Sequence, residues 1–145
     1  AAFGDILGAD GEIDRRKLGG IVFADEDARR KLNSIVHPAV MAESRAQIEN
    51  ARASGVKVCI LDVPLLFETG MEKLCDETWL IYVPREEQIR RMAERDGLDA
   101  AAAAARIDSQ MPLEEKLKRA DVAIDSSGTI EQTREKLRCL WEERT

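Results

Sequence analysis

The sequence predicts an α/β fold with a parallel sheet, and three features of its 145 residues support this prediction. Two short apolar runs, at 58–61 and 79–83, are rich in β-branched or aromatic residues and are typical of strands buried on both faces. A third, shorter run lies at 122–124. Helical patterns separate and follow these runs, and strands that alternate with helices indicate right-handed crossovers.

The first third of the chain has helical periodicity. Apolar residues recur at spacings of three and four in 18–22 and again in 28–36, which predicts two short helices. Asp25 is placed to cap the second of them, with further acidic residues in the first turn. Pro38 disfavours helical geometry in the residue before it, so it is expected to end that helix and to begin a third, which runs to about Ala53.

Four more helices are predicted in the second half of the chain, over 85–95, 100–109, 113–119 and 130–143. Gly97 is expected to end the first of these, because glycine readily adopts the left-handed backbone conformation. Asp99 is placed to begin the second. Thr129 and Gln132 have the spacing of a capping box at the start of the last helix.

Composition and charge exclude several classes of protein. With 44% hydrophobic and 34% charged residues, the chain is expected to be one soluble globular domain rather than a disordered segment. Its net charge of −6 repels phosphate backbones, so it is not expected to bind nucleic acid. No apolar run approaches the roughly 20 residues that span a bilayer, and the first residues do not resemble a signal peptide. A cytoplasmic protein without a membrane partner is therefore expected.

The cysteines and the single histidine do not indicate a metal site. Cys59, Cys75 and Cys139 are odd in number and lack CxxC spacing, so they are expected to be reduced core thiols rather than disulfide or zinc ligands. His37 is the only histidine in the sequence and precedes a proline. It is expected to be a turn or capping residue rather than a catalytic base.

Candidate ligand loops follow the predicted strands, because ligands of open parallel sheets bind beyond the carboxyl ends of the strands. Asp62 closes a four-residue apolar run, which is the pattern of a carboxylate that organises magnesium, although many buried strands also end in Asp as a turn residue. The segment 64–68 is an apolar loop with an acidic end. It is either packed on the core or forms an apolar wall for a bound ligand.

The segment 85–119 carries eight cationic and eight acidic side chains, so it is neutral overall. Arg91 and Arg95 lie one helical turn apart, and Arg106 and Gln110 lie one turn apart on the helix after Gly97. Two helices that present arginines could form a mobile lid that closes over phosphates. The alternative is a solvated hairpin held by ion pairs along each helix.

Several motifs together, in their order along the chain, resemble the dephospho-coenzyme A kinase family. The likeness runs from 10–11 to Trp141. The motifs are Leu32-Asn33-x-Ile35-x-His37-Pro38, Asp62-Val63-Pro64-Leu65-Leu66-Phe67-Glu68, Arg95-Asp96-Gly97, Arg106-Ile107-x-Ser109-Gln110-Met111-Pro112, the segment Lys116 to Asp121, and Ile124-Asp125-x-Ser127-Gly128.

The resemblance implies a P-loop kinase fold with a five-stranded parallel core. Residues 1–55 would form a helical acceptor-binding region, 56–84 core strands and the substrate loop, 85–112 the lid helices, and 113–145 a core strand and helix. The implied reaction transfers the γ-phosphoryl group of ATP to the 3'-hydroxyl of dephospho-coenzyme A, with Mg²⁺, as the last step of coenzyme A biosynthesis. The partners are thus small molecules, and the oligomeric state is left open.

The resemblance also implies roles for individual residues. Arg106 would be catalytic, and Asp62 would help to hold the metal. The acceptor would contact His37, Pro64, Leu65, Leu66, Phe67 and Glu68. ATP would contact Arg95, Arg106 and Gln110 at its phosphates, and Ser126, Ser127 and Gly128 near its base.

The sequence departs from the family in one respect. Such kinases need a P-loop, G-x-x-x-x-G-K-[ST], but none of the nine glycines here is followed by lysine. The acidic residue that accepts the proton of the acceptor hydroxyl also has no counterpart. Both are expected to precede residue 1, in about 60 further residues, or roughly two strand-helix units. The 145 residues alone are therefore expected to be inactive. The alternatives are a P-loop-less module that binds a coenzyme A-like ligand or a protein, and another small-substrate kinase, such as a nucleoside monophosphate kinase.

Overall fold

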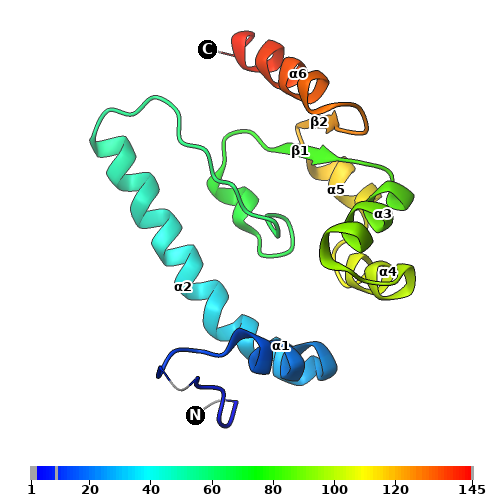
Figure 1. Ribbon diagram of the computed structural model, residues 1–145. Helices are drawn as coiled ribbons and strands as arrows, with labels where there is room; N and C mark the ends of the chain where they lie inside the picture. Colours follow the sequence, from blue (N-terminus) through cyan, green and yellow to red (C-terminus); the bar gives the residue numbers. More distant parts are fainter. Residues whose placement is uncertain (1–2, 9, 145) are drawn as a thin grey trace. The chain divides into compact units, whose positions relative to one another are not determined.

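The computed structural model describes residues 3–8 and 10–144 (Figure 1). They form two compact units, Ala1–Leu61 and Asp62–Thr145. The first contains two helices, and the second combines a small parallel sheet with helices. The second unit therefore confirms the predicted α/β class, and each unit is described below by itself.

The first unit consists mainly of helices α1 (Arg15–Ala24) and α2 (Glu26–Ala53). Asp25 joins them, because its backbone N–H donates to the carbonyl of Ile21 while its side chain accepts from the first backbone N–H groups of α2. The predicted cap at this residue is confirmed. Glycine follows the end of α2 at position 55 with a φ of 74°, as expected of a residue that stops a helix.

The prediction that Pro38 ends a helix is wrong, because α2 continues through it for 28 residues in all. A proline inside a helix removes one backbone donor and leaves the carbonyl four residues earlier without its helical partner. Here that carbonyl belongs to Ser34, and both Ser34 and Pro38 are exposed. Water can hydrate the carbonyl, so the interruption costs one hydrogen bond rather than the helix.

The predicted strand at 58–61 is also wrong, since these residues have no regular secondary structure and pair with no other described segment. Side chains in this run are open to solvent, and Ile60 is 77% exposed. The apolar pattern matched a buried strand, but a strand forms only where a neighbour completes its hydrogen-bond ladder. In the described parts of this unit the only bridge is an antiparallel one between Leu7 and Ile13.

The second unit holds strands β1 (Trp79–Tyr82) and β2 (Val122–Asp125), which pair in parallel with Trp79 opposite Val122. Both strands were predicted. The described residues form a two-stranded sheet, not the five-stranded core that the resemblance implied. The prediction that the strands are buried on both faces is therefore wrong. Ile124 of β2 is 2% exposed, but Ile81 of β1 is 53% exposed.

Three helices lie between the two strands, and one follows them (Figure 1). All four were predicted, and their ends are set by local signals. Gly97 ends the first in the left-handed conformation, with φ 66°. The side chain of Asp99 accepts from the backbone N–H of Ala102 at 2.7 Å. The elements are η1 (Met71–Leu74), α3 (Arg85–Asp96), α4 (Ala100–Asp108), α5 (Leu113–Arg119) and α6 (Ile130–Glu142).

The core of the second unit lies around the sheet and the loop that precedes it. Its buried apolar residues are Phe67, Met71, Val83, Ala103 and Ile124. The cysteines lie outside this core. They form no disulfide among the described residues, and Cys59 and Cys139 are exposed while Cys75 is half-buried. The expectation of core thiols is therefore wrong for Cys59, in the unpaired run, and for Cys139, on the outer face of α6.

No helix in the described ranges is long and apolar enough to cross a membrane.

Candidate functional site

A cavity of about 570 Å³ lies at the carboxyl ends of the two strands. Because β1 and β2 are parallel, the residues that follow each strand meet at one edge of the sheet. The cavity brings three of the predicted site residues together: Pro64, Gln110 and Ser126. Cationic side chains from two helices also line it, namely Arg85 and Arg91 of α3 and Lys116 of α5. Two carboxylates, Asp108 and Glu114, line it as well, so the three cations exceed the acidic side chains by one. A hollow with apolar walls and an excess of cations can accept an anionic ligand.

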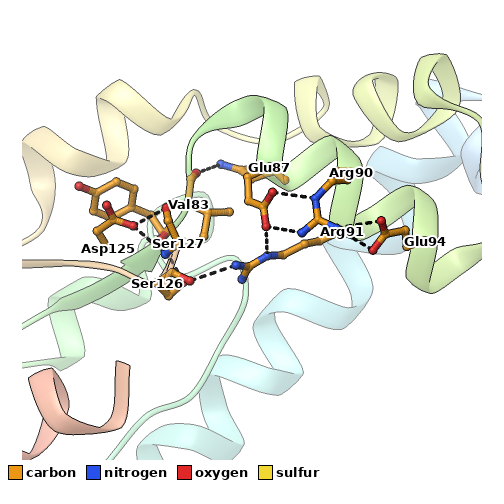
Figure 2. A network of polar contacts seen from close by, with 10 residues as sticks. Val83, Glu87, Arg90, Arg91, Glu94, Asp125, Ser126 and Ser127 are labelled. Atoms are coloured by element: carbon orange, nitrogen blue, oxygen red, sulfur yellow. Dashed lines mark hydrogen bonds and ion pairs between the residues drawn. The ribbon is translucent and has the colours of Figure 1, made fainter. Parts of the chain in front are cut away.

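The turn after β2 is held by backbone and side-chain hydrogen bonds (Figure 2). The backbone N–H and the hydroxyl of Ser126 both donate to the carbonyl of Tyr82, at 2.8 and 3.1 Å. The backbone N–H and the hydroxyl of Ser127 donate to Asp125 Oδ1 at 2.8 and 2.6 Å. These two bonds keep the pKa of Asp125 below its ordinary value. The turn is thus tied to the end of β1.

Gly128 is required by the start of the next helix. In the capping box of α6, the side chain of Thr129 accepts from the N–H of Gln132, and the side chain of Gln132 accepts from the N–H of Thr129. A Cβ at position 128 would collide with that glutamine side chain. The capping box, predicted from the sequence, therefore explains the glycine.

Arg91 on α3 reaches the same turn and was not predicted to do so. Its Nη2 donates to the carbonyl of Ser126 at 3.1 Å, and its Nε donates to Glu87 at 2.6 Å (Figure 2). Glu87 also accepts from Arg90, which in turn binds Glu94. Hydrogen bonds from Arg90 and then Arg91 lower the pKa of Glu87 to about 2, from an ordinary 4.5. The network keeps this carboxylate charged and fixes the arginine.

Two predicted phosphate-binding arginines meet at one carboxylate in the hairpin of α3 and α4. Arg95 Nε binds Asp96 Oδ1 at 2.7 Å, and Arg106 Nη1 binds Asp96 Oδ2 at 3.2 Å. The hydrogen bonds from Arg95 are the main cause of a pKa of Asp96 below its ordinary value. Both guanidinium groups remain open to solvent, at 72% and 46% exposed. They could therefore exchange part of their contact with Asp96 for a phosphate.

Glu68 and Gln110 are brought together by a lysine that sequence reasoning did not select as a site residue. Lys116 Nζ pairs with Glu68 Oε1 at 2.7 Å and donates to Gln110 Oε1 at 3.3 Å. Glu68 also accepts from the backbone N–H of Met111 at 3.1 Å. Burial raises the pKa of Glu68, but these hydrogen bonds and the charge of Lys116 outweigh it, and the net pKa lies below 4.5. The only sequence signal for this role was the place of Lys116 in a family motif.

The sequence left open whether the apolar loop 64–68 packs on the core or forms a wall for a ligand, and different residues of the loop fit each interpretation. Pro64 lines the cavity. Phe67 is 7% exposed and belongs to the core. Leu65 and Leu66 are half-buried between these extremes.

Of the predicted site residues, only Pro64, Gln110 and Ser126 line the cavity, and two of the others lie in different surroundings again. Asp62 is exposed, and the described residues contain no group of three or more His, Cys, Asp or Glu side chains that could hold a metal ion. His37 belongs to the first unit and is half-buried within α2. The expectation that it is a turn or capping residue is wrong, because the helix continues through the proline after it.

Comparison with known proteins gives one family. A family model described as dephospho-CoA kinase matches residues 1–132. A dephospho-CoA kinase of Carboxydothermus hydrogenoformans is 53% identical over 133 residues, which are 92% of this chain and 65% of that protein. One of Geobacillus kaustophilus is 51% identical over 94% of this chain and 69% of that protein. This chain thus spans about two thirds of the length of these relatives.

Solved structures give the same result. A dephospho-CoA kinase from Campylobacter jejuni is 33% identical and superposes with a TM-score of 0.68, over 97% of this chain and 69% of that chain. A Thermus thermophilus protein is 35% identical, with a TM-score of 0.74 over 99% of this chain and 73% of that chain.

Proposed function

The chain belongs to the dephospho-CoA kinase family, and on that premise we propose that the protein transfers the γ-phosphoryl group of ATP to the 3'-hydroxyl of dephospho-CoA. This reaction gives CoA and ADP and is the last step of CoA biosynthesis. The observation that supports it best is the cavity at the strand ends, where basic side chains and the Ser126 turn surround one space. Both substrates are polyanionic, so a basic cavity suits them.

ATP would bind with its base near the turn of Ser126, Ser127 and Gly128, and with its phosphates toward the hairpin of α3 and α4. Arg106 would act as the catalytic arginine, supported by Arg95. Phosphoryl transfer depends mainly on positioning and on stabilising the charge of the transferring group. In this proposal the arginines, held together by Asp96 without ligand, turn to the phosphates when the hairpin closes.

The acceptor would lie on the other side of the reacting phosphate. Pro64 and its neighbours in the loop 64–68 would form its apolar wall, with His37 contributing from the helical region. Gln110 would contact ATP, and Lys116 and Glu68 would hold Gln110 and the substrate loop in place. The placement of Gln110 beside Lys116 supports this arrangement.

Magnesium would accompany ATP. Mg²⁺ is usually held by one or two carboxylates together with substrate phosphates. Asp62, two residues before Pro64 of the cavity lining, would supply one such carboxylate. When bound, the ion would neutralise phosphate charge. The residues of the chain would orient the nucleotide and exclude water.

The phosphate-binding loop of such kinases is not among the 145 residues, since no glycine is followed by lysine. We therefore expect the chain alone to show no turnover. The direct test is a chimera in which this chain replaces the matching region of the Carboxydothermus hydrogenoformans relative. We expect the chimera to form ADP in the presence of dephospho-CoA and the isolated chain to form none.

Two results would contradict the proposal. ADP formation by the isolated chain that depends on dephospho-CoA would show that the phosphates are bound without a P-loop. A folded chimera that phosphorylates a nucleoside monophosphate in preference to dephospho-CoA would show a different acceptor. Calorimetric binding of dephospho-CoA by the isolated chain, combined with an inactive folded chimera, would favour a ligand-binding module instead.

A further inference from the structure

Helix α3 and the turn after β2 are connected by a single side chain. The guanidinium of Arg91 uses one nitrogen, Nε, to bind Glu87 on its own helix and another, Nη2, to bind the carbonyl of Ser126. Arg91 and Ser126 are 35 positions apart in sequence. Figure 2 shows the guanidinium between the carboxylate and the turn. Because the guanidinium is planar and rigid, holding one edge fixes the direction of the other donors.

The carboxylate that holds Arg91 is itself fixed. Glu87 accepts two hydrogen bonds from Arg90, at 2.8 and 2.6 Å, and Arg90 binds Glu94 one turn further along. The side chain of Glu87 is 24% exposed, which makes it better shielded than its partners. Helix α3 therefore presents Arg91 to the turn through a chain of ion pairs rather than through one flexible contact.

The turn has other anchors, and they come from different elements. Ser126 is bound to Tyr82 at the end of β1, and Lys136 of α6 donates to the carbonyl of Asp125 at 2.7 Å. Arg91 is the contact from α3, the helix that carries Arg95 and begins the hairpin with α4. A movement of that hairpin would therefore reach the turn through Arg91.

We propose that Arg91 is a positioning residue that couples the hairpin of α3 and α4 to the turn at Ser126, and through this turn sets the affinity for the base end of ATP. The inference rests on the proposed function for the identity of the ligand. Arg91 lines the cavity and its side chain is 42% exposed. The coupling itself stands on geometry, because the guanidinium holds both bonds at once.

The test has a structural arm and a kinetic arm, and both compare Arg91→Met with Arg90→Met. Arg90 is a matched control, since it lies on the same helix and binds the same Glu87 but has no hydrogen bond to the turn. In the isolated chain, hydrogen exchange of the backbone amides of Ser126 and Ser127 is followed by NMR. We expect Arg91→Met to speed this exchange about tenfold. Arg90→Met removes one support of Glu87 but leaves both bonds of Arg91 in place, so it should speed the exchange clearly less.

In the chimera, Arg91→Met should raise the KM for ATP about tenfold and leave the KM for dephospho-CoA within twofold. Loss of a residue needed only for folding would lower the amount of active enzyme and hence the apparent kcat. It would not raise the KM for ATP while leaving the KM for dephospho-CoA unchanged. If Arg91→Met does not fold, Arg91→Lys is used. Lysine keeps the charge, but its compact ammonium lacks the planar set of donors with which the guanidinium binds two groups at once.

The outcomes separate the two proposals. An unsubstituted chimera without dephospho-CoA kinase activity would overturn the proposed function, while the exchange arm would still decide the coupling. Equal exchange in the Arg91 and Arg90 variants would overturn the coupling. An active chimera in which both KM values rise together would overturn the assignment to ATP.

Discussion

Lys116 and Glu68 form a shielded ion pair, with Nζ and Oε1 2.7 Å apart and side chains only 13% and 19% exposed. The two residues belong to different parts of the second unit, since Glu68 ends the loop 64–68 and Lys116 lies on α5. Glu68 also binds the backbone of Met111, which follows α4. One carboxylate therefore holds the loop, the end of the hairpin and α5 in register.

Removing the cation of this pair should destabilise the second unit. We expect Lys116→Met to lower the free energy of unfolding by about 2 kcal/mol, because it leaves the Glu68 carboxylate half-buried without its charged partner. Urea denaturation followed by circular dichroism measures the change. Lys118→Met is the control on the same helix: its pair with Glu115 is exposed, and its loss should cost less than about 0.5 kcal/mol. Equal losses in the two variants would contradict the prediction.

Glu87 should make stability depend on pH in the acid range. Its pKa falls from 4.5 to about 2 in the folded protein, so its contribution is complete above about pH 5 and is lost as the pH falls toward 2. We expect Glu87→Gln to lower the urea midpoint at pH 6, and this difference from the unsubstituted chain to shrink steadily as the pH is lowered to 2. In a chain that already carries Arg90→Met and Arg91→Met, the same substitution should give almost no pH-dependent difference. A difference that does not change between pH 6 and 2 would show that Glu87 acts through packing instead.

Arg106 should affect chemistry more than binding. In the chimera, Arg106→Met is expected to lower kcat about a hundredfold, because a positive charge would be missing where charge develops on the transferring group. Steady-state kinetics with ATP and dephospho-CoA provide the measurement. Arg138→Met serves as the control, since Arg138 pairs with Glu135 along α6. A rise in KM for ATP with kcat unchanged would assign Arg106 to ground-state binding only.

Gly128 should be intolerant of a side chain for a structural reason. We expect Gly128→Ala to cost about 1 kcal/mol, because the new Cβ displaces the Gln132 side chain and opens the capping box of α6. In a Gln132→Ala background the same change should cost much less, because the colliding side chain is gone. Thermal unfolding of the four proteins measures this coupling, and additive losses would refute it.

Local signals in the sequence were sufficient for much of the fold. Asp25, Gly97, Asp99 and the capping box at Thr129 each act within a few residues, and the structure has a helix end at every one of them. Strand predictions needed more than local information. The run 79–82 has a partner in β2 and forms a strand, whereas 58–61 has an equally apolar pattern and no partner among the described residues.

The sequence offered candidate site residues but not the contacts that connect them. The sequence pointed to the strand ends and to the arginines of the hairpin, because both follow from spacing along the chain. It did not indicate that Arg91 reaches Ser126 or that Lys116 reaches Glu68, since these contacts join residues far apart in sequence. Whether a charged side chain binds its own helix or another element is decided by tertiary packing, which spacing alone does not encode.

The unpaired run that precedes Asp62 has a consequence for the handling of this protein. Val58 and Ile60 lie in this run and are 44% and 77% exposed. Apolar strand-like segments with open hydrogen-bonding groups are templates for pairing between molecules, and flanking charges act as gatekeepers. Here Lys57 and Asp62 are the charges on either side of the run. We expect the isolated chain to aggregate at high concentration, with fibre-like cross-β contacts that start from this run.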